Sequence, residues 1–209
     1  MQMHSINPAT GQIMQSFPLW RADQIDTTLA QMESAQAGWA TIDFEQRARC
    51  MRNLAQVFRQ NSETYALMIT EEMGKLLKEA RAEIEKCAIG CEHYAEHAAT
   101  YLKDEIIVSD ASRSVVVYQP LGVILCIMPW NFPFWQLIRA AAPALMAGNA
   151  VALKHASNVP RCALALERAF QQAGFPENIF RTFMISAEQA ERVIADRRSP
   201  HCCRDVDGQ

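Results

Sequence analysis

The sequence predicts an α/β protein in which N-terminal helices precede part of a doubly wound parallel sheet. Val123–Met128 is an unbroken apolar run of strand length, bounded by Gly122 and Pro129. A strand of this kind must be covered on both faces, which is typical of parallel sheets. From Val123 onward, strand-like and helix-like segments alternate, which favours parallel strands joined by helices.

The composition is that of an ordinary globular protein. The chain has 209 residues, of which 50% are hydrophobic and 21% are charged, and its net charge is -3. We expect no nucleic-acid binding from an acidic chain without a basic tract, and no apolar run is long enough to span a membrane. The seven cysteines are odd in number and irregularly spaced. This pattern favours reduced thiols and a cytoplasmic location.

The first hundred residues carry mostly helical spacing. Residues 5–11 form a turn-rich lead-in, and residues 13–17 read as a short strand. Helices are predicted from about 23 to 39, 44 to 61, 62 to 73 and 76 to 102. The apolar side chains of the last helix recur every three to four residues, which predicts that one of its faces is buried.

Histidines and cysteines gather on this last helix. His93 and His97 are four residues apart and share a face, with Cys87 and Cys91 nearby. The order of Glu and His does not match a metalloprotease motif, and the two cysteines lie on the predicted inward face. We therefore expect core thiols and no metal site.

The second half of the chain begins with a predicted hairpin. Two β-branched runs flank the turn-prone residues 109–112, which indicates a hairpin over about 106–118. After the strand at 123–128, helices are predicted at 134–147, 159–173 and 187–194, and strands at 150–153 and 179–184.

Three polar side chains stand where chemistry could occur. Asn131 follows one predicted strand, Lys154 ends the next, and Arg139 lies on the apolar helix between them. Ligands of open α/β sheets bind at the carboxyl ends of the strands. Asn131 is therefore either a turn former or a donor to an oxyanion, and Lys154 is either solvated or a contact to a nucleotide ribose. Arg139 either extends to the surface or binds a carboxylate.

The chain resembles the aldehyde dehydrogenase superfamily. Ile127-Met-Pro-Trp-Asn-Phe-Pro133 matches the signature around the family's oxyanion-hole asparagine, and Asn149-Ala-Val-Ala-Leu-Lys154 matches the strand that ends at its nucleotide-binding lysine. Further motifs in the family's order are Ile6–Gly11, Glu72–Lys75, Tyr118–Gly122, Ala144–Asn149 and Gly174–Pro176. The similarity implies a partial, Rossmann-like cofactor-binding domain over residues 1–196, with the hairpin belonging to the oligomerisation region.

The resemblance also implies roles for individual residues. Asn131 would stabilise the oxyanion of a cysteine thiohemiacetal. The cofactor-binding residues would be Ile127, Met128, Pro129, Trp130, Asn131, Lys154, His155, Ala156 and Ser157. Ser157 stands where NAD-preferring members have a glutamate, and a hydroxyl can bind a 2′-phosphate that a carboxylate would repel. The implied cofactor is therefore NADP, or NADP and NAD alike. His155 replaces a proline that is usual in the family.

Arg139 falls where succinate-semialdehyde dehydrogenases place an arginine that binds the distal carboxylate of the substrate, and Phe134 and Trp135 would line the pocket. The resemblance is closest to the bacterial NAD(P)-dependent enzymes of this type, oxidoreductases that convert succinate semialdehyde to succinate. It implies a small aldehyde as substrate, with no nucleic acid or membrane as partner. Intact members form homo-oligomers. For this chain, assembly, non-catalytic nucleotide binding and subunit interaction are left open.

Part of the family's chemistry falls outside the matched segment. The cysteine nucleophile and the glutamate base belong to later segments, and none of the seven cysteines lies in a matching motif. We therefore expect an N-terminal fragment that lacks the catalytic domain and is inactive alone.

Residues 197–209 depart from the family pattern. His201-Cys-Cys-Arg-Asp-Val-Asp-Gly-Gln209 stands where the family has a strand of the type Ile-Ala-Ala-Val-Thr-Leu-Thr-Gly-Ser. One permitted set of codons for this tail, read one nucleotide later, encodes Ile-Ala-Ala-Val-Thr-Leu-Thr-Gly. We therefore expect an aberrant tail produced by a frameshift near residue 198, which the coding DNA would reveal.

Overall fold

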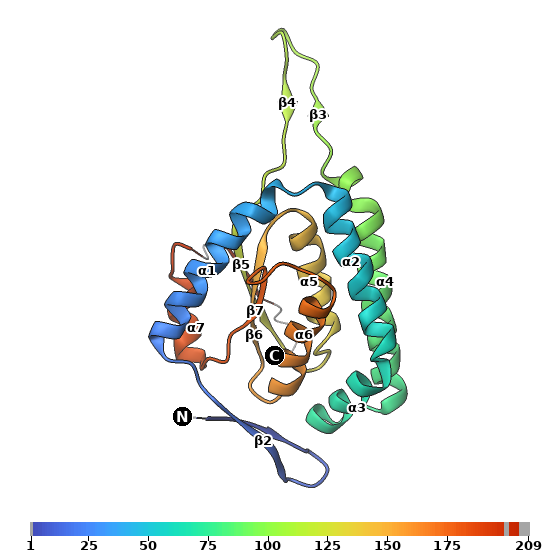
Figure 1. Cartoon of the computed structure of the whole chain (residues 1–209), viewed down its shortest axis with the longest axis vertical. Helices are drawn as coiled ribbons and strands as arrows, with labels where there is room; N and C mark the ends of the chain where they lie inside the picture. The colour runs from blue at the N-terminus through green and yellow to red at the C-terminus, as the bar shows by residue number, and fades with distance from the viewer. Residues whose placement is uncertain (1, 199–200, 205–209) are drawn as a thin grey trace.

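A computed structural model describes residues 2–198 and 201–204 of the chain (Figure 1). Its helices are α1 (Ala22–Thr41), α2 (Phe44–Gln60), α3 (Ser62–Met73), α4 (Leu77–Tyr101), α5 (Trp135–Met146), α6 (Pro160–Gln172) and α7 (Ala187–Ile194). Its strands are β1 (Gln2–Ile6), β2 (Ile13–Pro18), β3 (Glu105–Ile106), β4 (Val115–Val116), β5 (Val123–Met128), β6 (Ala150–His155), β7 (Phe180–Thr182) and β8 (His201–Arg204).

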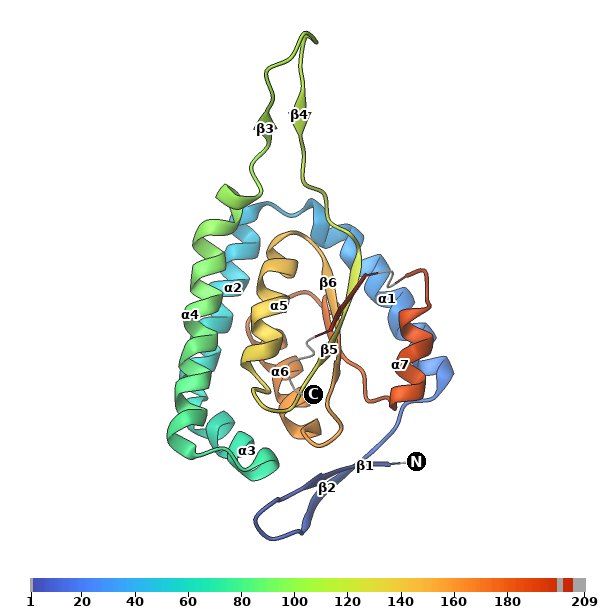
Figure 2. The ribbon, with the colours of Figure 1, turned by 180° about the vertical axis from the view of Figure 1, so that it is seen from behind.

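Four parallel strands form the central sheet, in the order β7-β6-β5-β8. Helices α5 and α6 lie against one face of this sheet, and α1 and α7 lie on the other (Figures 1 and 2). Helices α2 and α4 pack outside α5 and α6 as a further layer. The predicted doubly wound parallel sheet is confirmed.

The central strands β5 and β6 are covered on both faces. Four of the six residues of β5 and five of the six of β6 are buried, so both read as continuous apolar runs rather than as alternating ones. Asn149 joins their amino ends, because its Oδ1 accepts hydrogen bonds from the backbone N–H groups of Leu121 (2.6 Å) and Gly122 (3.1 Å). Its Nδ2 donates to the carbonyl of Ala144 (2.9 Å), which ties the end of α5 to the same point.

Part of the tail enters the sheet. His201–Arg204 form β8, which pairs in parallel with residues 124–127 of β5. Four residues of the tail that the sequence analysis describes as aberrant thus pair with the central sheet. The edge of β5 presents backbone N–H and C=O groups that an extended segment can satisfy whatever its side chains. The frameshift stays a prediction, and residues 205–209 lie outside the described part of the chain.

Two antiparallel hairpins extend from the body of the molecule (Figure 1). In the N-terminal hairpin, the sequence predicted β2 but not β1. The predicted hairpin at 106–118 is confirmed, although only residues 105–106 and 115–116 pair as strands. Its apolar side chains face solvent, with Ile106 82% exposed and Val108 98% exposed.

The long helix α4 buries the face that its spacing predicts. Cys87 and Cys91 lie fully within the core. His93 and His97 stack on the surface with ring centroids 4.5 Å apart. Among the described residues, no group of three or more potential ligands is placed to hold a metal ion, and no helix is long and apolar enough to cross a membrane.

A buried carboxylate, Glu72, connects three separate elements. Only 2% of Glu72 is exposed. Its Oε1 accepts from the Ser5 hydroxyl in β1 (2.5 Å) and from the N–H of Arg161 in α6 (2.9 Å), and its Oε2 accepts from the N–H of Cys162 (2.8 Å). Helix α6 has no side-chain cap of its own. Glu72, near the end of α3, therefore supplies the acceptors that the first turn of α6 needs.

Replacing Glu72 by alanine should lower the free energy of unfolding by about 3 kcal/mol, because three donors, two of them buried, lose their acceptor. The control is Glu71→Ala at the adjacent residue, whose carboxylate pairs with the Arg161 guanidinium at 44% exposure. We expect a loss of about 0.5 kcal/mol there. Urea unfolding of both variants measures the difference, and equal losses would contradict the capping role of Glu72.

Candidate active site at the carboxyl ends of β5 and β6

The parallel register of β5 and β6 brings the predicted site residues to one edge of the sheet. Ile127 pairs with Lys154, and Met128 pairs with His155. The turn that follows β5, residues 129–134, therefore lies beside the segment that follows β6, residues 155–157. All nine predicted cofactor-binding residues belong to these two segments and to the strand ends that precede them.

Asn131 lies within the turn and is partly buried. Its Oδ1 is enclosed without a hydrogen-bond partner. No hydrogen bond of Nδ2 is found among the described residues either. An amide that turns its oxygen inward leaves its N–H groups as the donors available to a ligand. The geometry is therefore compatible with a hydrogen-bond donor at this point.

The backbone just after Asn131 is held by a residue that the sequence analysis did not select. Glu83 of α4 is 3% exposed. Its Oε1 accepts from the N–H groups of Phe134 (2.9 Å) and Trp135 (3.0 Å), and its Oε2 pairs with the ammonium of Lys75. The sequence did contain an indication of this role, because Glu83 falls beside Ile84 on the predicted inward face of α4. Charged side chains are rarely buried unless they are paired, so a glutamate on that face points to a specific partner.

Both helix N-termini at this corner are already occupied by carboxylates. Glu83 takes the first N–H groups of α5, and Glu72 takes those of α6. The N-terminus of a helix is a common binding site for phosphate. Here the donors are used and a second anion would be repelled. The phosphates of a nucleotide at this corner must therefore be bound by other groups.

Lys154 is a partly buried cation at the end of β6. Burial lowers the pKa of its ammonium. No carboxylate pairs with it among residues 2–198 and 201–204. Ser157, three residues further along, is exposed. The Lys154 ammonium can bind hydroxyl or phosphate oxygens of a ligand, and the exposed Ser157 hydroxyl can donate to the same kind of oxygen.

His155 is buried between the two segments. Its Nε2 lies 2.8 Å from the carbonyl oxygen of Pro133, and its Nδ1 lies 2.9 Å from the N–H of Ala156. A carbonyl can only accept and an N–H can only donate, so the imidazole is neutral and carries its proton on Nε2. Burial lowers the pKa of His155 to about 4.

The structure separates Phe134 from the two other predicted substrate residues, Trp135 and Arg139, which lie one turn apart on α5. Phe134 is fully buried and packs against Phe58 and Tyr65, so the prediction that it lines a pocket is wrong. Trp135 is partly buried, and its ring lies over Gly90 of α4, where a Cβ would come within 3.1 Å of it. Arg139, one turn later on α5, is exposed.

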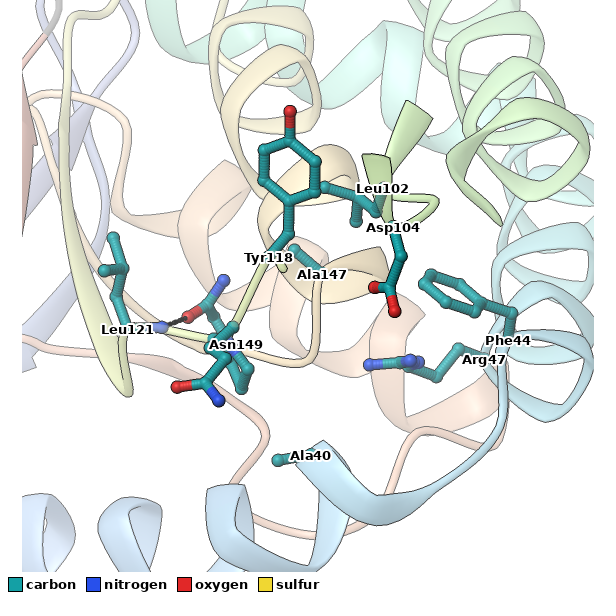
Figure 3. A pocket seen from close by; sticks show the side chains of 11 residues that line it. Ala40, Phe44, Arg47, Leu102, Asp104, Tyr118, Leu121, Ala147 and Asn149 are labelled. Carbon is teal, nitrogen blue, oxygen red and sulfur yellow. Dashed lines mark hydrogen bonds between the residues drawn. The ribbon is translucent and has the colours of Figure 1, made fainter. Parts of the chain in front are cut away.

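A cavity of about 330 Å³ lies at the opposite, amino end of β5 and β6 (Figure 3). Arg47 reaches into it over the ring of Phe44 and packs against Gly148, where a Cβ would lie 2.6 Å from Nη1. Asp104 and Tyr118 line the same cavity. Because open α/β sheets bind ligands at the carboxyl ends of their strands, this cavity is not the candidate active site.

Comparison with known proteins identifies the family of the chain. Residues 1–203 match the aldehyde dehydrogenase family. The chain belongs to this family. A probable succinate-semialdehyde dehydrogenase (NADP+) of Synechocystis sp. is 48% identical over 198 residues, which cover 95% of this chain and 44% of the relative. A succinate-semialdehyde dehydrogenase (NADP+) of Mycobacterium tuberculosis is 44% identical over 201 residues, with the same shares covered.

Solved structures of aldehyde dehydrogenases have the same fold. Succinic semialdehyde dehydrogenase from Streptococcus pyogenes, in complex with NADP+, superposes with a TM-score of 0.93 at 32% identity, covering 97% of this chain and 45% of the other. An NAD-dependent aldehyde dehydrogenase from Sinorhizobium meliloti gives a TM-score of 0.91 at 25% identity, covering 98% of this chain and 42% of the other. The chain thus spans less than half the length of these relatives.

The neutral state of His155 predicts a pH dependence of stability. In the unfolded chain the imidazole binds a proton below about pH 6.5, whereas in the folded protein it stays neutral down to about pH 4. The free energy of unfolding should therefore fall by up to about 3 kcal/mol as the pH drops through this window. His155→Phe should remove this slope, and His93→Phe, on the surface of α4, should retain it. Unfolding curves across the window measure both, and identical slopes would contradict the assignment.

Proposed function

We propose that this chain forms the oxyanion and cofactor-ribose side of an aldehyde dehydrogenase active site that oxidises an aldehyde through a cysteine thiohemiacetal. The observation that carries the proposal is the register of β5 and β6, which brings the Asn131 turn and Lys154 to the same edge of the sheet. Family membership supports the reaction class.

In this reaction Asn131 donates a hydrogen bond from Nδ2 to the oxygen that becomes negatively charged when a thiolate attacks the aldehyde. A donor that is already in place stabilises that charge without reorganising solvent. Removing one donor of this kind typically costs about 3 kcal/mol of transition-state stabilisation. The enclosed Oδ1 supports this role, since an oxygen without space for a ligand leaves the N–H groups of Nδ2 as the side chain's donors.

NADP is the proposed cofactor, with NAD as a weaker alternative. When bound, it would supply the acceptor for the hydride of the aldehyde carbon. Lys154 would bind the ribose hydroxyls, Ser157 the 2′-phosphate, and the backbone of residues 127–130 would line the path toward the nicotinamide. The relatives named as NADP-dependent support the preference, and so does the lack of a carboxylate at Ser157.

Succinate semialdehyde is the proposed substrate, by similarity to relatives that carry this name. Arg139 would bind its distal carboxylate, with Trp135 beside it. The two residues are four apart on α5 and therefore share a face. The exposure of Arg139 supports access by a ligand.

We further propose that residues 1–196 form part of the cofactor-binding domain and that the nucleophile and the general base lie outside this chain. A catalytic cysteine needs a thiolate, but burial raises the pKa of the Cys87, Cys91 and Cys162 thiols. Cys202 and Cys203 pair with Leu125 and Cys126 in the middle of β5, away from the Asn131 turn.

The buried thiols of Cys87, Cys91 and Cys162 form no disulfide, which favours a reducing compartment such as the cytoplasm.

The chain alone should bind NADP+ without forming NADPH from succinate semialdehyde. Binding can be followed by titration of NADP+ against the fluorescence of Trp130, which is 47% exposed. Lys154→Ala should weaken this binding by about tenfold, equivalent to about 1.4 kcal/mol. Ser157→Glu should weaken binding of NADP+ but not of NAD+. Lys103→Ala, an exposed lysine after α4, serves as the control. Turnover by the chain, or equal effects of the three substitutions, would contradict the proposal.

A second proposed function is subunit interaction through the β3–β4 hairpin. Ile106, Val108 and Val117 are 82%, 98% and 56% exposed. Soluble proteins rarely leave a contiguous apolar surface of this kind uncovered. The short ladder of the hairpin also has free edges that could pair with another strand. The proposed partner is a second copy of this chain or a longer homologous subunit.

Self-association should depend on this hairpin. Light scattering coupled to gel filtration should give a mass that rises with concentration, and the double substitution Ile106→Asp and Val117→Asp should hold the chain at its monomer mass. Ile89→Asp, at a 55% exposed position on α4, should leave the association unchanged. A chain that is monomeric at every concentration would exclude self-association through the hairpin.

A further inference from the structure

The turn that carries Asn131 is held from two sides by buried groups. On one side, Glu83 accepts from the N–H groups of Phe134 and Trp135. On the other side, His155 donates from Nε2 to the carbonyl of Pro133. Three consecutive residues of the backbone are thus fixed by side chains from α4 and from the end of β6.

Lys75 completes the first of these anchors. It is 8% exposed, its ammonium pairs with Glu83, and the same nitrogen lies 3.6 Å from the centre of the Phe132 ring. The cation therefore balances the buried carboxylate and contacts the turn directly. A phenyl ring on one face and a carboxylate on another leave Lys75 little freedom to move.

His155 links the turn to the cofactor side of the corner. The N–H of Ala156 is shared between the carbonyl of Met128 (3.0 Å) and Nδ1 of His155 (2.9 Å). The imidazole thus connects the last hydrogen bond of the β5–β6 ladder with the carbonyl of Pro133.

Asn131 depends on these anchors because its own side chain is not held. Its Oδ1 is enclosed without a partner, and within the described chain Nδ2 makes no hydrogen bond. The direction of the amide is therefore set by the backbone of the turn, which is held at Phe132, whose carbonyl accepts from the N–H of Gln136 (3.0 Å), and at Pro133. A shift of that backbone would change where Nδ2 points.

We propose that Glu83, Lys75 and His155 are positioning residues that hold the Asn131 turn from two sides and so fix the direction of the Asn131 amide. The inference rests on the oxyanion role proposed for Asn131. None of the three residues needs to touch substrate or cofactor. Glu83 and Lys75 act through the start of α5, and His155 acts through the carbonyl of Pro133.

The test is the nuclear magnetic resonance signal of the Asn131 side-chain amide in the nucleotide-free chain. The two Nδ2 protons should give one sharp pair of signals in the unmodified protein. Glu83→Gln and His155→Phe should each broaden that pair or replace it by several, while each variant remains folded in urea titrations. Glu83→Asp, which retains the charge, should keep more of the sharp signal than Glu83→Gln.

The control is Glu85→Gln on the same helix, where the carboxylate pairs with Arg59 on the surface. It should leave the Asn131 signal unchanged. If Glu83→Gln does not fold, His155→Phe still decides the question. A sharp, unshifted Asn131 signal in folded His155→Phe and Glu83→Gln would overturn the proposal. Because this signal requires neither nucleotide nor aldehyde, its outcome is independent of whether the chain binds NADP+.

Discussion

The carboxylate of Glu83 is the contact on which the candidate site depends. It is buried on α4, is balanced by Lys75, and accepts from the N–H groups of Phe134, the N-cap of α5, and Trp135, its first residue. Burying a carboxylate costs free energy, and a cation partner and hydrogen bonds to its oxygens offset that cost. Glu83 has both, and its hydrogen bonds fix the start of the helix that follows the Asn131 turn. The outer helical layer therefore determines where the turn at the carboxyl end of β5 lies.

Glu72 and Glu83 have the same role at neighbouring helices, because each accepts backbone N–H groups at the start of a helix. The helices α5 and α6 follow the two central strands, and neither has a side-chain cap of its own. In each case a glutamate provides the acceptor, Glu83 from α4 for α5 and Glu72 from α3 for α6. The consequence for binding is that neither helix offers its N-terminus to a phosphate. The groups that we propose for ligand binding at this corner are therefore the Asn131 amide, the Lys154 ammonium and the Ser157 hydroxyl.

The fold could be predicted from the sequence because its signals are local. Continuous apolar runs marked β5 and β6, and the spacing of the apolar side chains marked α4. The long-range contacts of the site could not be predicted in this way. Glu83 and Phe134 are 51 residues apart, and nothing near either residue indicates that they meet. For the same reason Phe134 was assigned to a pocket, although its ring completes an aromatic cluster with Phe58 and Tyr65. β8 was missed because it forms by backbone pairing at a sheet edge, for which its side chains give no signal.

The most direct measurement of the capping by Glu83 and Glu72 is hydrogen exchange of four backbone amides in the nucleotide-free chain: Phe134, Trp135, Arg161 and Cys162. If buried carboxylates hold both helix starts, these N–H groups should exchange only when the whole domain unfolds, with an opening free energy equal to that of global unfolding. Exchange as fast as that of Ser112 at the exposed tip of the hairpin would contradict the account, since it would mean that both helix starts are open to solvent.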